Sequence, residues 1–217
     1  MTVGPVWTRL NGRICALIVQ TDSEAFRKVL GRLEGDVGGL LALLLASWEA
    51  DRTQGKKPAL TPYWAFARML FPIAEAIGDL IYRNDKSTVR NLTAVLENEF
   101  ESVRPGYKGK ANVIALMYRH SLTHTDEMRA LCYPPNTVNW KLSLGAQSNH
   151  LRVQNPATNQ RELQFDLTAF YEDLRQVCLN AQKEKWEGKV ARRYNEWPLL
   201  NLNIKEHKRA ISQIERL

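Results

Sequence analysis

One arginine and two histidines lie close together in the chain, and they are the side chains best suited to chemistry. The segment Met117-Tyr-Arg-His-Ser-Leu-Thr-His-Thr-Asp126 contains Arg119, His120 and His124. A guanidinium stays charged at neutral pH and binds a phosphate through two parallel hydrogen bonds, whereas a histidine exchanges a proton near neutrality. Cleavage of an RNA phosphodiester requires both functions, because protons must move and the phosphorane needs a fixed positive charge.

Positive charge without negative charge surrounds this segment. Between Ser102 and Thr125 there is no Asp or Glu, and the basic residues are Arg104, Lys108, Lys110 and Arg119. Such a stretch suits a polyanion, because neutralising phosphates releases their counterions. We therefore predict that Lys108 and Lys110 bind RNA.

A second basic region lies at the C-terminal end of the chain. Residues 183–217 have nine basic and five acidic side chains, with Trp186, Tyr194 and Trp197 among them. Aromatic rings stack on unpaired bases, so Arg192 and Arg193 are further predicted RNA-binding residues. The alternative is a solvated basic surface whose aromatic residues anchor it to the rest of the protein.

The run Arg119-His-Ser-Leu-Thr-His124 resembles the signature of the HEPN superfamily, which consists of helical-bundle proteins that include many RNA-cleaving toxins and defence nucleases. That signature is an arginine, four to six residues and a histidine, commonly with a polar residue after the arginine. The resemblance covers roughly residues 61–182. It implies that Arg119 and His124 are the catalytic pair, that His120 assists, and that a homodimer shares the cleft. It also implies cleavage without a metal or other cofactor, and a possible cognate inhibitor protein.

The spacing of the three residues leaves other interpretations open. At about 100° per residue, positions 119 and 124 lie about 140° apart on a straight helix, whereas His120 and His124 share one face. One cleft therefore needs a helix end, a bend or two protomers. The histidines could instead be half-buried core groups or zinc ligands, and Arg119 a structural ion pair. The competing functional class is a non-catalytic module that binds nucleic acid or protein, either regulatory or antitoxin-like.

The elements that must position the motif are mostly helices. Apolar residues at helical spacing predict helices over 21–48, 61–82, 87–103, 111–124 and 167–181, with a terminal amphipathic helix over 204–217. Thr21 with Glu24 forms a capping box, Pro72 should kink the second helix, and the glycines at 35–39 could divide the first. We thus predict a mainly α fold, a HEPN-like helical bundle.

Strand periodicity interrupts the helices once. Apolar residues alternate with polar ones from Val138 to Leu144, residues 145–149 favour a turn, and alternation resumes at Leu151. This pattern predicts a small antiparallel β-hairpin insertion at about 137–166, with His150 exposed in the turn. The predicted organisation is a helical domain over 1–182 and a basic C-terminal extension over 183–217.

Composition excludes several classes of protein. The 217 residues carry a net charge of +7, with 44% hydrophobic and 24% charged residues, which is typical of a folded domain. The longest apolar run is too short to span a bilayer, so we expect a cytoplasmic protein without a membrane partner. Three widely spaced cysteines favour neither a disulfide framework nor a zinc knuckle. Motifs of the common nucleotide-binding and hydrolase folds are absent.

Overall fold

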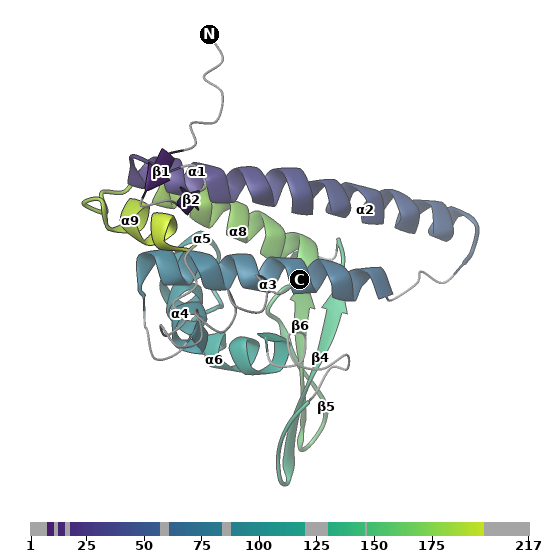
Figure 1. The fold of residues 1–217 in the computed structure, drawn as a ribbon. Helices are drawn as coiled ribbons and strands as arrows, with labels where there is room; N and C mark the ends of the chain where they lie inside the picture. The colour runs from purple at the N-terminus through teal and green to yellow at the C-terminus, as the bar shows by residue number, and fades with distance from the viewer. Residues whose placement is uncertain are drawn as a thin grey trace, which may run out of the picture.

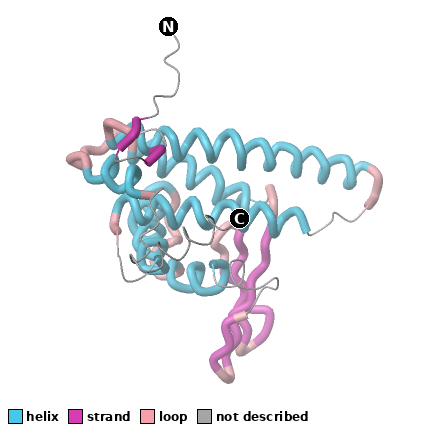
Figure 2. Tube along the Cα trace, in the orientation of Figure 1, coloured by secondary structure: helices cyan, strands magenta, loops and turns pink. Residues whose placement is uncertain are grey.

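Helices make up most of the described structure, and a small sheet extends from one end of them (Figures 1 and 2). The structure is a computed structural model that describes residues 8–10, 13–15, 18–56, 61–83, 88–119, 130–145 and 147–197. The prediction of a mainly α fold is confirmed. A short antiparallel pair of strands, β1 (Thr8–Leu10) and β2 (Arg13–Cys15), lies near the start of the first helix.

The first helical run is α1 (Asp22–Arg32), a π-helical turn η1 (Leu33–Val37) and α2 (Gly38–Thr53). The Thr21 hydroxyl caps it by accepting from the Glu24 N–H at 3.1 Å, and the Glu24 carboxylate accepts from the Gln20 N–H at 2.8 Å. The glycines at 35–39 do not break the run: Gly35 lies in the widened turn η1, and Gly38 and Gly39 lie in α2.

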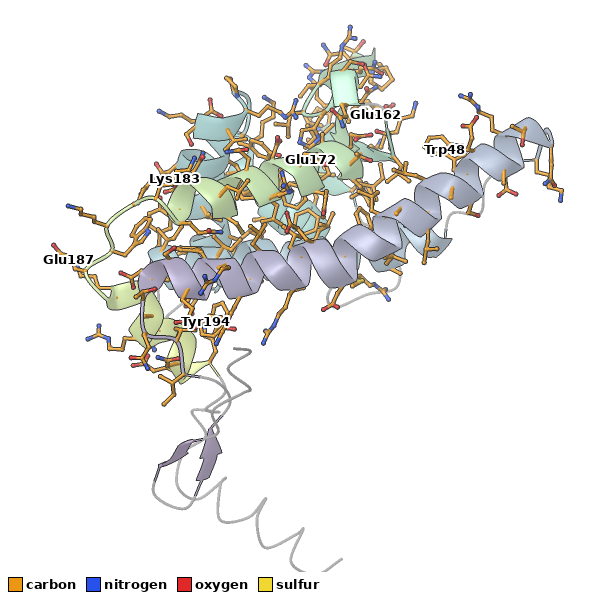
Figure 3. All side chains as sticks on the ribbon, turned by 90° about the horizontal axis from the view of Figure 1, so that it is seen from above. Trp48, Glu162, Glu172, Lys183, Glu187 and Tyr194 are labelled. Atoms are coloured by element: carbon orange, nitrogen blue, oxygen red, sulfur yellow. The ribbon has the colours of Figure 1, made fainter. Side chains whose placement is uncertain are left out.

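The far half of α2 reaches past the helices beneath it (Figures 1 and 3). Although α2 is rich in leucine, Leu41 is its one buried residue, and Leu43 is 70% exposed. Packing against the bundle is thus concentrated in α1 and η1, where Phe26, Val29 and Leu33 are buried.

The two helical runs that follow α2 pack closely side by side. They are α3 (Thr61–Ile81), which continues through Pro72, and a run of α4 (Thr88–Val95), η2 (Leu96–Phe100) and α5 (Glu101–Val103). At their closest approach Gly78 faces the backbone of α4: a Cβ on Gly78 would lie 2.7 Å from the carbonyl carbon of Asn91. Only glycine permits this separation of the two helices.

The remaining helices enclose an aromatic core. They are α6 (Ala111–Ile114) with η3 (Ala115–Arg119), α8 (Leu167–Ala181) and α9 (Lys189–Glu196). Phe170 of α8 lies at the centre, with its ring centroid 5.0 Å from those of Phe71 and Phe165 and 5.3 Å from that of Phe100. These rings bring α3, η2, α8 and the sheet into one hydrophobic core.

The sheet has four strands in the order β3-β4-β6-β5, and it is mixed rather than antiparallel. Its strands are β3 (Leu131–Tyr133), β4 (Asn136–Ser143), β5 (Val153–Ala157) and β6 (Gln160–Asp166). β3–β4 and β5–β6 pair as antiparallel hairpins, but β4 and β6 pair in parallel, with Trp140 opposite Leu163.

The predicted pairing of the two halves across the turn at 145–149 is therefore wrong. β6 lies between β4 and β5 because it carries the apolar residues: Leu163 and Phe165 are buried, whereas every residue of β5 is exposed. β5 also contains Pro156, which lacks an N–H and is tolerated at a sheet edge. The connection through η4 (Gln147–Asn149) carries the chain past β6 to that edge.

Part of the predicted C-terminal extension packs on the bundle. Val190 and Tyr194 of α9 are buried, and the Asp22 carboxylate of α1 accepts hydrogen bonds from the N–H groups of Gly188 and Ala191 at 2.7 and 2.8 Å. The side chain of Asn195 both accepts from and donates to the backbone of Val19. Residues 198–217, with the predicted terminal amphipathic helix, lie outside the described residues.

We expect that Gly78→Ala lowers the free energy of unfolding by about 1–3 kcal/mol, because the added methyl group would overlap the α4 backbone and push the helices apart. The matched control is Gly39→Ala, at an exposed helical position with no atom near the added Cβ. It should raise stability by about 0.5–1 kcal/mol. Urea unfolding of both variants measures this difference. Equal effects would contradict the close contact.

Candidate functional site

The predicted catalytic motif includes the last described residues of a well-anchored helical segment. Ile114, Ala115 and Met117 are buried, and they fix the α6–η3 segment against the bundle. Arg119 is the last residue of η3, but its side chain is not described. His120 and His124 lie outside the described residues, so their geometry relative to Arg119 stays a prediction.

The basic loop before this helix, residues 104–110, is held in place by its own hydrogen bonds. Gly106 and Gly109 take positive φ angles of 120° and 79°. The N–H groups of Gly106 and Lys108 both donate to Oε2 of Glu101, at 2.9 and 2.7 Å. The Lys110 ammonium donates to the Gly106 carbonyl at 2.9 Å, whereas Lys108 is exposed. The loop thus turns back on the end of α5.

Beneath this loop lies a buried polar cluster, the Tyr107 network, which comprises Arg104, Tyr107, His150 and Asp173. The Tyr107 hydroxyl donates to Oδ2 of Asp173 at 2.9 Å and lies 2.8 Å from Nε2 of His150. Nε of Arg104 donates to the same carboxylate oxygen at 2.7 Å. Tyr107 is fully buried and the Asp173 side chain is 4% exposed, so the network lies in the interior except at Arg104.

The hydrogen bonds define the protonation of His150. Its Nδ1 accepts from the backbone N–H of Asp166 at 2.9 Å, so the single proton of the neutral ring is on Nε2 and is donated to the Tyr107 oxygen. Burial, and secondarily the positive charge of Arg104, lower the pKa of His150 to about 3. His150 is therefore neutral at physiological pH.

Tyr107 and Arg104, two other members of the network, also have shifted pKa values. Burial, together with the Asp173 carboxylate, raises the pKa of Tyr107 well above its usual value. The hydrogen bond that Arg104 donates to the Asp173 carboxylate likewise raises the pKa of Arg104. The result is a directed chain of donors, from His150 through Tyr107 to a carboxylate that Arg104 neutralises.

The network continues into the start of α8. Asp166 is the N-cap of that helix: Oδ1 accepts from the Ala169 N–H at 2.9 Å, and Oδ2 accepts from the Ser143 hydroxyl at 2.8 Å. The Thr168 hydroxyl accepts from the Gly145 N–H at 3.1 Å. These bonds join the ends of both parallel strands, β4 and β6, to the helix that follows.

Sequence reasoning missed this network and expected His150 to be exposed, which is wrong. The turn residues before His150 favour an exposed loop, but His150 and Leu151 are both buried, and the His150 ring lies 4.7 Å from that of Phe165. One signal was readable: Asp173 lies three residues after Phe170 and four before Val177, on the apolar face of its helix. A carboxylate there needs a buried partner.

The four predicted RNA-binding residues have different surroundings. Lys108 and Arg192 are exposed, whereas Nη1 of Arg193 donates to the carbonyls of Leu80 and Ile81 at 2.6 and 2.7 Å. Arg193 thereby caps the C-terminal end of α3. Within the described residues, no hydrogen bond or ion pair joins the loop pair, Lys108 and Lys110, to the α9 pair.

The aromatic residues of the second basic region, Trp186, Tyr194 and Trp197, pack in or against the hydrophobic core. Trp186 lies 6.1 Å from Phe26, measured between ring centroids, and its indole N–H donates to the Ala181 carbonyl. The indole N–H of Trp197 donates to Asp79 at 3.1 Å. Their part-buried position fits anchoring residues better than open stacking surfaces.

Neither a metal-binding cluster among the described residues nor a related protein identifies the site. Among the described residues, no group of three or more His, Cys, Asp or Glu side chains is arranged to hold a metal ion. No described helix combines the length and apolar character needed to cross a membrane. Comparison with protein-family models, curated proteins and solved structures found no match to this chain.

We expect that Tyr107→Phe lowers the free energy of unfolding by about 1–3 kcal/mol, because it leaves the buried Nε2–H of His150 without an acceptor and removes a donor from Asp173. Tyr171→Phe is the control, since that hydroxyl makes no hydrogen bond within the described part of the chain, and its effect should be near zero. Denaturant unfolding measures both. Equal stability of the two variants would contradict the role of the Tyr107 hydroxyl.

The His150 imidazole should also make stability depend on pH. Its pKa is about 3 in the folded protein and about 6.5 when unfolded, so the unfolded state takes up the proton first and stability is lost as pH falls below 6.5. Between pH 7 and pH 5 the loss from this group is about 2 kcal/mol. His150→Gln removes this contribution, so unfolding free energies of wild type and variant should converge over that range. A constant difference would contradict it.

Proposed function

We propose that this chain is a HEPN-like endoribonuclease that uses Arg119 and His124 and needs no metal. The observation that carries the proposal is the position of Arg119 in a helical segment anchored by Ile114 and Met117, with an acid-free basic loop directly before that segment.

In this scheme His124 moves protons and Arg119 stabilises charge. A base takes the proton of the 2′-hydroxyl, the 2′-oxygen attacks phosphorus, and the P–O5′ bond breaks while an acid protonates the leaving 5′-oxygen. The products are a 2′,3′-cyclic phosphate and a 5′-hydroxyl. The Arg119 guanidinium neutralises the phosphorane, and His120 supplies a further hydrogen bond.

The remaining parts of the proposal concern assembly and partners. Two copies of the motif facing each other across a two-fold axis would bring four groups into one cleft, which overcomes the angular separation of Arg119 and His124 on a single helix. Lys108, Lys110, Arg192 and Arg193 are the proposed contacts to RNA phosphates. We further propose that the protein acts in the cytoplasm and that a cognate inhibitor restrains it.

We expect the purified protein to cleave mixed RNA in the presence of EDTA and to leave 2′,3′-cyclic phosphate ends. Arg119→Ala and His124→Ala should each reduce the rate by at least about a hundredfold, because each removes a group that acts in the transition state. End-group analysis and a single-turnover rate are the measurements.

Two controls make the assay specific. His207→Ala removes a histidine outside the motif and should leave the rate unchanged. The melting temperature of each motif variant should stay within a few degrees of wild type, whereas a collapse would indicate core histidines. RNA that binds but is never cut would favour the non-catalytic binding module.

A further inference from the structure

The basic loop between α5 and α6 already holds an anion. The N–H groups of Gly106 and Lys108 converge on one oxygen of the Glu101 carboxylate, at 2.9 and 2.7 Å. Hydrogen bonds from Lys108, Gly106 and Tyr107 lower the pKa of Glu101, so the carboxylate stays ionised. Successive main-chain N–H groups that point into one concavity form a nest that binds anions of any kind.

The positive charge around this nest is larger than the single negative charge of the Glu101 carboxylate. The Lys110 ammonium lies 2.9 Å from the Gly106 carbonyl, Lys108 is exposed beside the nest, and no acidic residue occurs between Ser102 and Thr125. A phosphate group brings more negative charge and more acceptor oxygens than a carboxylate does. It can therefore compete with Glu101 for the same donors.

The loop and the Glu101 side chain that it binds differ in rigidity. The loop is fixed from below, because Tyr107 is fully buried and its hydroxyl donates to Asp173, while Arg104 donates to the same carboxylate. Glu101 lies at the end of a helix with its side chain partly exposed. A change of Glu101 rotamer would empty the nest without altering the fold.

We propose that the loop at 105–109 is a phosphate-binding site, that the Glu101 carboxylate closes it in the free protein, and that a backbone phosphate of RNA displaces that carboxylate. The existence of the nest is independent of the ribonuclease proposal, and only the identification of the phosphate as part of RNA rests on it. Glu101 then acts as a built-in competitor that sets the affinity of the loop.

The experiment compares Glu101→Gln with Glu97→Gln in the full chain. Both remove one negative charge, but Glu97 is exposed one helical turn away and makes no contact with the loop in the described structure. A glutamine at 101 still accepts a hydrogen bond, so the loop should keep its shape. Pyrophosphate and a 2′-O-methyl RNA octamer, which resists cleavage by the proposed mechanism, are the probes.

We expect Glu101→Gln to bind both probes about tenfold more tightly than Glu97→Gln does, because the competing charge at the nest is gone. The amide signals of Gly106 and Lys108 should shift on titration in an NMR spectrum, and adding Lys108→Ala should reverse the gain. Equal affinities of the two variants, or unmoved amide signals, would overturn the site.

The two probes separate this proposal from the ribonuclease proposal. Tighter pyrophosphate binding with unchanged octamer binding would overturn RNA as the ligand and retain a site for small phosphates. Tighter binding of both probes by a protein that never cuts RNA would support the nest and count against catalysis by Arg119 and His124.

Discussion

The hydroxyl of Tyr107 is the contact on which the arrangement of the other elements depends. It lies between His150, which comes from the connection of the sheet, and Asp173, which comes from α8. Burying a carboxylate, a phenol and an imidazole together is costly unless every donor finds an acceptor. The hydrogen bonds that satisfy these groups therefore hold the loop, the sheet and α8 in their observed arrangement.

This constraint also determines what can be exposed. With Tyr107 held inside, the residues on either side of it must turn outward, so Lys108 lies at the surface and the N–H groups of the loop face Glu101. The same buried group therefore supports the core and shapes the proposed phosphate site. Stability and the proposed phosphate binding are therefore coupled at this position, because the loop cannot shift without disturbing the network.

A second constraint is the close packing of helices at glycine. Gly78 lets α3 approach the backbone of α4, and the bundle then encloses a core in which Phe170 contacts rings from three other elements. The π-helical turns at η1 and η2 lie within this packing: Leu33 and Phe100 are both buried. An extra residue in a helical turn changes which side chains face the core afterwards.

Local sequence determined most of the helices, because apolar spacing and the Thr21 cap act over a few neighbouring residues. Sequence alone also singled out Arg119, His120 and His124, whose chemistry stays a prediction. Only the tertiary structure decided the parallel pairing of β4 with β6, the burial of His150 and the capping of α3 by Arg193. These features join residues more than 20 positions apart, or they depend on which strand is the most apolar. A local sequence pattern does not show which distant group will form the hydrogen bond of a buried polar atom.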